Sequence, residues 1–397
     1  MLAERVNKIN ESPTMRVATE ARRMQAQGIN VIDFSIGEPD FPTPYNIKEA
    51  AKFGIDDNHT RYTAIAGTVE LRKAIAQKLK TDNGLEYDIN EIIVTSGAKQ
   101  SVFNALFATV NKGEEVIIPA PYWVSYPDMV SMAEGNSVFV ETNEKNGFRI
   151  TPEQLEKAIS PKTKALILCN PSNPTGSAYS KKELEDLAAV CLKHNFYIIS
   201  DEIYEKLVYD NFEFVSFAAL SPEIKKRTIL VNGVSKSYSM TGWRIGYTAA
   251  PKDVISAMNK IQSHSTSHPS SVSQYAAIEA LTGSQSAISD MRTEYKKRRD
   301  YLYDQLISID GITCYKPEGA FFLFPNVSAF FGRKNEKMKV NNSFDLAMYL
   351  LTDGKIAVVP GTGFGAEGYL RISYATSMEN IKEASKRFKG TIQHLKP

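Results

Sequence analysis

Long apolar runs are missing from the sequence, and no window reaches the ~18 uninterrupted apolar residues that a membrane span needs. Residues 1–23 mix acids, bases and prolines, and they lack the apolar region and cleavage site of a secretion signal. The 3 cysteines lie far apart, so neither a disulfide framework nor a zinc site is indicated for Cys169, Cys191 and Cys314. We therefore expect a cytoplasmic protein without membrane contact, whose thiols are buried and reduced.

An excess of charge of one sign is also missing, since 47 Lys and Arg stand against 45 Asp and Glu. A nucleic-acid surface needs a concentrated basic stripe. The one candidate, Lys296–Arg299, lies in a segment of alternating charge, and we expect a solvated helix face instead. Among the 5 histidines only His264 and His268 are four residues apart, and Pro269 favours a loop there. We expect neither a nucleic-acid partner nor a metal site.

The 397 residues suggest two domains, and a pattern of strands and helices marks the first. Short apolar runs alternate with segments of helical period, and Thr151 and Ser180 each begin a capping box at a helix start. Strands rich in Val, Ile and Leu between helices are typical of a parallel sheet. The seven predicted strands cover residues 91–95, 115–119, 137–141, 164–169, 196–200, 228–232 and 244–249. We predict an α/β fold in which a seven-stranded, mostly parallel sheet with helices on both faces occupies residues 45–285.

After Gly283 the pattern changes to a mixture of longer helices and isolated strands. A final helix is expected to begin at Thr376, with Glu379 at the capping-box spacing. The preceding elements are a charged helix over about 286–310, a segment at 319–327, a helix near 344–351, and strands at 356–359 and 369–374. The segment before Tyr45 has no alternation of its own. We predict that residues 1–44 and 286–397 form a smaller α+β domain.

Ligands of α/β sheets bind at the carboxyl ends of the strands, so we expect site residues in the loops there. The loop Val234–Arg244 follows the strand at 228–232. Its Lys236 can form a Schiff base with an aldehyde cofactor, and burial would lower its pKa toward neutrality. A hydroxyl and a guanidinium, from Ser235 and Arg244, suit a phosphate dianion. Most lysines are surface residues, so this loop alone does not decide the function.

Two further strand ends carry polar residues that suit a cofactor ring. Asp201 ends an apolar strand, where a carboxylate needs a cationic partner such as a protonated pyridine nitrogen. The alternative for Asp201 is a helix N-cap. Tyr204 would face the same side of a helical turn and could donate to a phenolate oxygen of the cofactor. The loop Asn170–Gly176 contains two Asn-Pro steps and is either a plain turn or a rigid loop with one cis bond that aims an Asn amide inward.

Three other features are less specific when each is taken alone. Small residues in Thr95–Gln100 let backbone N–H groups approach a phosphate, although this segment is not a nucleotide-binding P-loop. Arg371, in the strand at 369–374, could hold an α-carboxylate with two hydrogen bonds or form an ion pair on an edge strand. Trp123 could stack on a cofactor ring or pack a helix onto the sheet.

Taken together and in this order, the motifs resemble the class I, fold-type I aminotransferases, which use pyridoxal 5'-phosphate (PLP). The chain is most similar to the bacterial aspartate aminotransferases of the thermophile type. The resemblance extends from Ile36–Phe41 to Tyr369–Ala375. Its most specific motifs are Ser235–Gly246, Asn170–Gly176 and Ser200–Tyr204.

The resemblance implies a role for each residue near the cofactor ring. Lys236 holds PLP as a Schiff base and then moves a proton between the substrate Cα and the cofactor C4′. Asp201 pairs with the pyridinium nitrogen, and Asn173 and Tyr204 bond to the phenolate oxygen. Trp123 stacks on the ring, and Trp123 and Asn173 also contact the substrate.

The resemblance also implies how the phosphate is held. The backbone N–H groups of Gly97 and Ala98 bind it, together with the side chains of Ser235 and Arg244. The hydroxyl of Tyr62 reaches it from a neighbouring subunit. A homodimer with two shared active sites follows from this arrangement.

The resemblance implies an amino acid and a 2-oxo acid as substrates, with L-aspartate and 2-oxoglutarate as the expected pair, which yield oxaloacetate and L-glutamate. Arg371 and the backbone at Gly37 hold the α-carboxylate. Lys99, with Thr14 as a helper, resembles the pair that binds the distal carboxylate in this subgroup. The alternative for Lys99 is a solvated residue in the first turn of a helix. Because the same pair resembles that of prephenate aminotransferases, prephenate is a second substrate candidate.

Other functions fit the sequence less well. An aromatic aminotransferase or a carbon–sulfur β-lyase would keep Lys236, Asp201 and Arg371 and differ in the pocket around Lys99. A PLP-sensing transcription regulator needs a fused DNA-binding module, for which the segment before Gly37 is too short. A nicotinamide dehydrogenase is disfavoured because no strand leads into a G-x-G-x-x-G loop.

Overall fold

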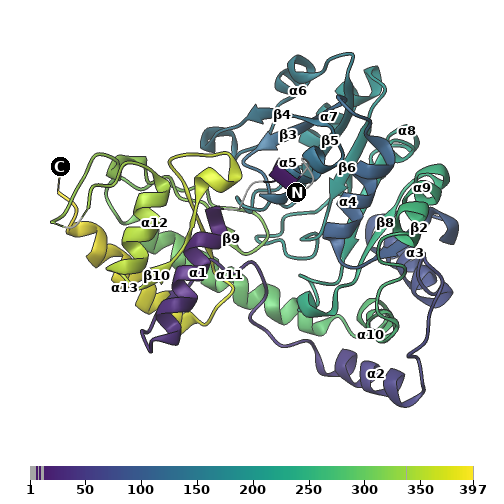
Figure 1. The fold of residues 1–397 in the computed structure, drawn as a ribbon, viewed down its shortest axis with the longest axis horizontal. Coiled ribbons are helices and arrows are strands. Elements are labelled where there is room, and N and C mark those ends of the chain that lie inside the picture. Colours follow the sequence, from purple (N-terminus) through teal and green to yellow (C-terminus); the bar gives the residue numbers. More distant parts are fainter. Residues whose placement is uncertain (1–5, 8, 10–12, 337, 397) are drawn as a thin grey trace.

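A seven-stranded sheet forms the centre of the chain in the computed structural model, which describes residues 6–7, 9, 13–336 and 338–396 (Figure 1). The strands are β2 (Ile92–Thr95), β3 (Glu115–Ala120), β4 (Asn136–Glu141), β5 (Thr163–Cys169), β6 (Tyr197–Asp201), β7 (Thr228–Gly233) and β8 (Gly246–Ala249). Their order is β2-β8-β7-β6-β5-β3-β4. β3 to β7 run parallel, whereas β8 is antiparallel to both of its neighbours. The predicted α/β fold and its mostly parallel sheet are confirmed.

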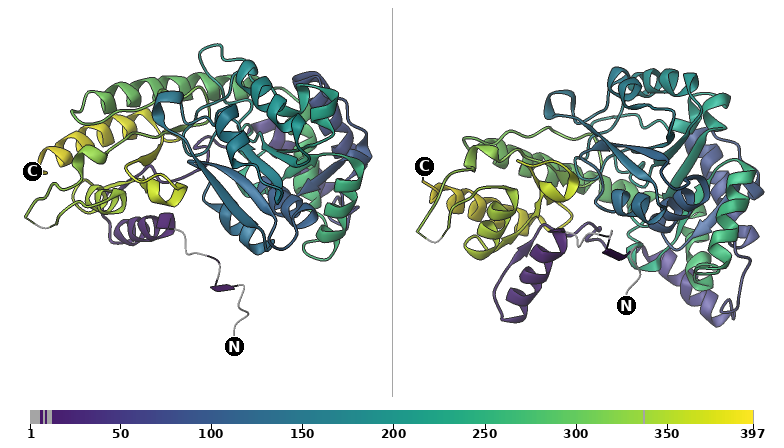
Figure 2. Two further views of the ribbon diagram at one scale, coloured as in Figure 1. Left: turned by 90° about the horizontal axis from the view of Figure 1, so that it is seen from above. Right: turned by 45° about the horizontal axis from the view of Figure 1, so that its top comes forward.

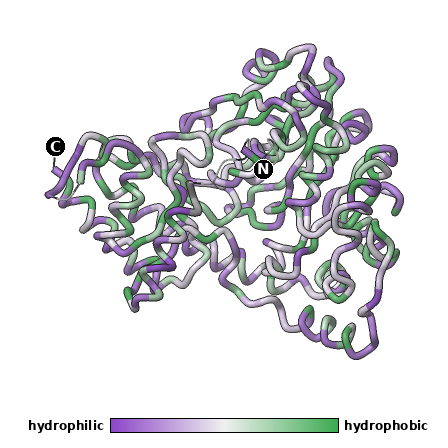
Figure 3. The backbone as a smooth tube through the Cα atoms, viewed as in Figure 1, coloured by the Kyte–Doolittle hydropathy of each residue, from purple (hydrophilic) through white to green (hydrophobic). Residues whose placement is uncertain are grey.

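Successive residues of the inner strands point to opposite faces of this sheet, and helices cover both faces. In β5, Ala165 and Ile167 enter one apolar layer, and Leu166 and Leu168 enter the other. The first layer is completed by α4 (Ala98–Thr109), α5 (Ser125–Met132) and α9 (Lys252–Ser263). The second is completed by α6 (Pro152–Ala158), α7 (Lys181–Lys193) and α8 (Pro222–Lys225). Figure 3 shows the resulting pattern, with hydrophobic colour concentrated along the central strands.

The predicted capping boxes are present at two of these helices. The hydroxyl of Thr151 accepts from the N–H of Gln154 at 3.2 Å, and the Gln154 side chain bonds back to the Thr151 N–H at 3.0 Å. Ser180 and Glu183 form the same reciprocal pair at the start of α7. Each box supplies partners for N–H groups that the first helical turn leaves unpaired.

Three helices gather near the β2 edge of the sheet. They are α2 (Tyr45–Asp56), α3 (Val69–Asn83) and α10 (Ser271–Thr282). α10 packs against both of the others, and α3 packs against β2. α2 therefore lies at the periphery of the molecule, as Figure 1 shows.

The C-terminal part combines helices with short strands. It contains α11 (Ser286–Ile307), α12 (Ser343–Thr352), α13 (Met378–Gln393), β9 (Phe322–Leu323), β10 (Ile356–Ala357), β11 (Val359–Pro360) and β12 (Leu370–Ser373). The N-terminal elements α1 (Pro13–Ala26) and β1 (Ile32–Asp33) lie beside it (Figure 2). β1 pairs with β10, and α1 packs against α12. Among the helices of the described ranges, none has the length and hydrophobicity to cross a bilayer.

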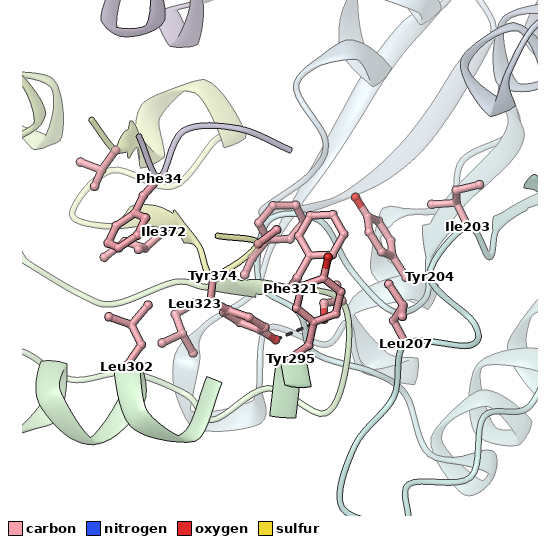
Figure 4. Close-up of a cluster of buried hydrophobic side chains, with 14 of the residues drawn as sticks. Phe34, Ile203, Tyr204, Leu207, Tyr295, Leu302, Phe321, Leu323, Ile372 and Tyr374 are labelled. Atoms are coloured by element: carbon pink, nitrogen blue, oxygen red, sulfur yellow. Dashed lines mark hydrogen bonds between the residues drawn. The ribbon is translucent and has the colours of Figure 1, made fainter. Parts of the chain in front are cut away.

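One apolar cluster joins this part to the sheet domain. It includes Leu71 and Leu230 from the sheet side, and Phe321 and Phe388 from the C-terminal side. Figure 4 shows part of the cluster, in which Phe321 lies near Tyr204. The division into residues 45–285 and residues 1–44 with 286–397 stays a prediction.

Two details predicted for the C-terminal part are wrong. The single strand at 356–359 is two short strands, β10 and β11, which pair in different sheets. The N-cap of α13 is Ser377 rather than Thr376, since the Ser377 hydroxyl accepts from the N–H of Asn380 at 3.1 Å. Both residues are good caps, so the spacing fits either one. The Thr376 hydroxyl instead accepts from the Asn380 side chain at 2.9 Å.

The prediction that Lys296–Arg299 faces solvent is wrong for Arg298 and Arg299, which are buried. Arg298 donates two hydrogen bonds to Asp40, at 2.8 and 2.9 Å. Arg299 forms an ion pair with Asp210 at 2.5 Å. This side of α11 therefore covers two loops of the molecule instead of facing water, and both partner acids are distant in the sequence.

Candidate active site

A cavity of about 340 Å³ lies where the carboxyl ends of β5, β6 and β7 meet the C-terminal part. Its wall contains most of the predicted site residues, namely Gly37, Ala98, Lys99, Trp123, Asn173, Asp201, Tyr204, Ser235, Lys236, Arg244 and Arg371. Parallel strands bring these residues together because their carboxyl ends share one edge of the sheet. Within the described part of the chain, no group of three or more His, Cys, Asp or Glu could hold a metal ion.

Lys236 lies in this cavity, three residues after β7 ends. Its Nζ donates a hydrogen bond to the carbonyl oxygen of Gly37 at 2.7 Å. Burial lowers the pKa of Lys236 to about 8, and the cations of Arg371 and Arg244 act in the same direction. The Glu38 carboxylate opposes this shift. A substantial fraction of Lys236 is therefore a neutral amine, and a nucleophile, near physiological pH.

Asp201 is the last residue of β6, and its side chain is buried. The hydroxyl of Tyr126 donates to Asp201 Oδ2 at 2.7 Å, while the N–H of Ile203 is 3.4 Å from Oδ1. Burial raises the pKa of Asp201, although both hydrogen bonds and the charge of Lys236 offset part of that rise. A turn follows Asp201, so the helix N-cap alternative is wrong. Asp201 is a buried acid with room for a cationic partner.

Tyr126 is a residue of this site that the sequence reasoning missed. It lies in the first turn of α5, three residues after Trp123, and the two rings meet edge to face at 5.3 Å between centroids. A spacing of three residues at a helix start places two side chains on one face. That spacing was the available signal. The hydrogen bond to Asp201 depends on the packing of α5 onto the sheet, which the local sequence does not reveal.

The segment between β2 and α4 forms a narrow cradle with Arg244. Gly97 has a φ of +86°, and a Cβ there would collide with the Arg244 guanidinium. Arg244 itself has a φ of +56°, and its NH1 donates to the Thr241 carbonyl oxygen at 2.9 Å. A non-glycine residue in this backbone region is strained and is held there by its surroundings. Ser235 is buried and also lines the cavity.

Arg371 lies on β12, the middle strand of the sheet β11-β12-β9, so the edge-strand alternative is wrong. Its NH1 donates to Asn173 Oδ1 at 3.1 Å, and its NH2 donates to the Ser35 carbonyl oxygen at 2.7 Å. Its buried Nε has no hydrogen-bond partner among the described residues. Burial lowers the pKa of Arg371 to about 10. The guanidinium is a fixed cation that keeps N–H groups free for an anion.

Asn173 and Tyr204 are both buried at the cavity. Both Asn-Pro steps of the loop Asn170–Gly176 are cis, where the sequence suggested one. Tyr204 lies in the turn after β6 and contacts Phe321 edge to face at 5.5 Å between ring centroids. Its hydroxyl-bearing ring is thereby supported by the aromatic core seen in Figure 4.

Lys99 belongs to the first turn of α4 and lines the cavity, and part of its side chain is also exposed to solvent. Its Nζ lies 4.9 Å from the centre of the Trp123 ring. Burial lowers the pKa of Lys99, and the Arg244 cation adds to this shift. Within the described residues Lys99 forms no salt bridge, and its charge is available to a ligand.

Gly97 and Tyr62 are not among the residues that line this cavity, although Gly97 lies against Arg244 beside it. Tyr62 is 94% exposed in the connection between α2 and α3. Thr14 belongs to α1, but its side chain lies outside the described residues. Most of the predicted site residues therefore lie together within one chain, whereas the side chain of Tyr62 faces the solvent.

Comparisons with known proteins agree with this geometry. The family model of class I and II aminotransferases matches residues 29–388. A probable aspartate/prephenate aminotransferase of Rickettsia bellii is 50% identical over 98% of both chains. An aspartate aminotransferase of Geobacillus stearothermophilus is 48% identical over 97% of both chains.

Solved structures give the same result. The aspartate aminotransferase from Rhizobium meliloti superposes with a TM-score of 0.97 at 44% identity and covers 100% of both chains. The Thermus thermophilus aspartate aminotransferase with maleate has a TM-score of 0.93 at 41% identity, covering 98% of this chain and 99% of that one. The chain therefore belongs to the class I and II aminotransferases, as its motifs predicted. It is an enzyme that transfers amino groups.

Proposed function

We propose that this enzyme uses PLP to transfer the amino group of L-aspartate to 2-oxoglutarate, producing oxaloacetate and L-glutamate. One observation carries the proposal: a single cavity combines an amine of lowered pKa, a buried acid and two cations suited to two carboxylates. These are Lys236, Asp201, Arg371 and Lys99. The relatives named as aspartate aminotransferases support the same choice of substrate.

The residues fit PLP in five respects. The Lys236 amine can bond to the aldehyde carbon. Asp201 offers its charge to a pyridinium nitrogen, because within the described part of the chain its Oδ1 has only the 3.4 Å contact with the Ile203 N–H. The Gly97–Arg244 cradle suits the phosphate, together with the Ala98 N–H and the Ser235 hydroxyl. The Trp123 ring supplies a stacking face. Tyr204 and Asn173 would hold the phenolate oxygen.

When bound, PLP supplies the electron sink that lets a substrate Cα lose its proton. Lys236 Nζ accepts that proton as a neutral amine and returns it to the cofactor C4′ as an ammonium, so one group serves both carbons. Arg371 holds the α-carboxylate with its free N–H groups and thereby fixes the Cα near Lys236. Asn173 keeps Arg371 in place through the 3.1 Å hydrogen bond.

We expect the apoenzyme to bind PLP faster as the pH rises through about 8, the pKa of Lys236, and to level off above it. Only the neutral amine attacks an aldehyde, and the fraction of neutral Lys236 rises across this range. Stopped-flow absorbance at a series of pH values measures the rate of attachment. A lysine of ordinary pKa, near 10.4, would instead give a rate still rising at pH 10.

We expect Lys99→Ala to lower kcat/KM for L-aspartate by about 30-fold or more and to leave L-alanine nearly unaffected. Removing one member of a buried charge pair costs about 2–5 kcal/mol, and alanine has no distal carboxylate to lose. The exposed Lys112→Ala is the matched control. An equal loss for both amino acids would contradict a distal clamp at Lys99. Thr14→Ala, as the helper, should show a smaller loss of the same selectivity.

Prephenate is a second candidate substrate, because relatives such as that of Rickettsia bellii are named aspartate/prephenate aminotransferases. The carboxylate on the prephenate ring is an anion with which Lys99 can also form an ion pair. Assaying prephenate against 2-oxoglutarate as amino acceptor, with glutamate as donor, separates the two activities.

We further propose that two copies form a homodimer in which Tyr62 of one copy reaches the PLP phosphate of the other. Large apolar side chains are exposed along α2 and the connection after it, among them Tyr45, Phe53, Ile55 and Tyr62. Such a patch is typical of a protein–protein interface. The cytoplasmic location expected from the sequence stays a prediction.

A further inference from the structure

The connection between α2 and α3, residues 57–68, contains neither α-helix nor strand and carries Tyr62. With 94% of Tyr62 exposed, its ring meets His268 edge to face at 5.6 Å between centroids. Side-chain packing therefore does little to place the Tyr62 hydroxyl. Its position depends on how firmly the backbone beneath it is held.

Gln274, a buried residue of α10, holds this backbone on both sides of the aromatic pair. Its Nε2 donates to the Thr63 hydroxyl at 3.1 Å and to the Pro269 carbonyl oxygen at 2.8 Å. Its Oε1 accepts from the N–H of Thr68 at 2.9 Å. Thr63 follows Tyr62 and Pro269 follows His268, so one amide links the two segments that carry the pair. All of its hydrogen-bonding directions but one are used.

Gln262, fully buried near the end of α9, holds the same connection against the sheet. Its Nε2 donates to the carbonyl oxygens of Ile65 and Val94, at 2.9 and 2.8 Å. Its Oε1 accepts from Asn104 Nδ2 at 3.0 Å. Gly67, with φ +94°, lies so close that a Cβ would meet a Val94 methyl group at 2.5 Å. Because β2 continues into the phosphate cradle, Gln262 sets the Tyr62 segment in register with that cradle.

We propose that Gln274, assisted by Gln262, is a positioning residue for the active site of the partner subunit. It holds the outward-facing Tyr62 where the partner's phosphate is to be bound. Apolar side chains of the same volume could fill these buried positions, whereas the two amides select one path of the backbone. This inference rests on the proposed homodimer with shared sites.

The test uses Gln274→Met, which keeps the length of the side chain and removes its hydrogen bonds. In the homodimer we expect PLP to dissociate about tenfold faster, the effect of losing a hydrogen bond to a charged group. Retained cofactor is counted by borohydride reduction, which fixes PLP to Lys236, followed by mass spectrometry of each chain. Unchanged release from the Gln274→Met homodimer would overturn the proposal.

A hybrid dimer distinguishes positioning in the partner from a structural effect within one chain. One protomer carries Gln274→Met and the other carries Lys236→Ala, so the only Lys236 lies in the Gln274→Met protomer. The phosphate of the PLP bound in the Gln274→Met protomer would be contacted by Tyr62 of the Lys236→Ala protomer, whose Gln274 is intact. We expect release at the native rate. Release as fast as in the Gln274→Met homodimer would show that Gln274 acts within its own chain and would overturn the proposal.

A parallel hybrid of Tyr62→Phe with Lys236→Ala tests the premise separately. PLP release from this hybrid at the native rate supports a Tyr62 that acts across the interface. Fast release from it would refute the shared site itself. If Gln274→Met does not fold, Thr63→Val removes a single acceptor and should give the same pattern with an effect of about threefold. Native release from the Thr63→Val homodimer would then count against the proposal.

Discussion

Lys236→Ala is expected to lower the rate of transamination by at least about 10⁴-fold, the upper range for loss of a general acid–base group. The change removes the amine that attaches the cofactor and the group that moves the proton. Among the described residues that line the cavity, the other amine is that of Lys99, whose Nζ lies 4.9 Å from the centre of the Trp123 ring. Steady-state assays with L-aspartate and 2-oxoglutarate measure the loss.

The Lys236→Ala protein should remain folded, because among the described residues the Lys236 Nζ hydrogen-bonds the Gly37 carbonyl oxygen alone. A thermal unfolding scan of the apoprotein is the control. Activity above about 1% of the native value in a folded variant would contradict the role assigned to Lys236.

Asp201→Asn is expected to lower kcat by about 150-fold to 5,000-fold while the fold is kept. The amide has the shape of the carboxylate and can still accept from Tyr126, but it lacks the charge that a pyridinium nitrogen needs. Breaking a buried ion pair by removing one charge costs about 3–5 kcal/mol, which corresponds to this range.

Tyr126→Phe is the graded companion of Asp201→Asn. It keeps the charge and removes only the 2.7 Å hydrogen bond, so a loss of about tenfold or less is expected. A kcat for Asp201→Asn within about threefold of native, or a Tyr126→Phe loss larger than that of Asp201→Asn, would contradict the account of this acid.

The strand ends of the site could be predicted because their signals are local. Lys236, Asp201 and Asn173 each follow an apolar run in the sequence, and the edge of a parallel sheet brings such positions together. The strand pattern also predicted all seven strands of the sheet. The pattern placed the start of the last strand at Arg244, whereas β8 begins at Gly246. Arg244 adopts a left-handed backbone conformation, which a strand does not accommodate.

Contacts between distant segments could not be predicted. Arg298 looked like part of a solvated face, since nothing near it in the sequence indicates Asp40 as its partner. The hydrogen bond of Tyr126 to Asp201 could not be predicted for the same reason, nor could those of Gln274 to the connection that carries Tyr62. Each depends on how helices pack, and a buried polar group finds its partner only in the folded chain.

The most direct test of the central claim follows the visible absorbance of the purified, PLP-loaded enzyme after L-aspartate is added. The account predicts conversion of the cofactor to its amine form by aspartate alone and reversal when 2-oxoglutarate is added. A response to aromatic or sulfur amino acids without one to aspartate or glutamate would contradict the aspartate assignment. The absence of any response in a folded, PLP-loaded enzyme would contradict amino-group transfer at this site.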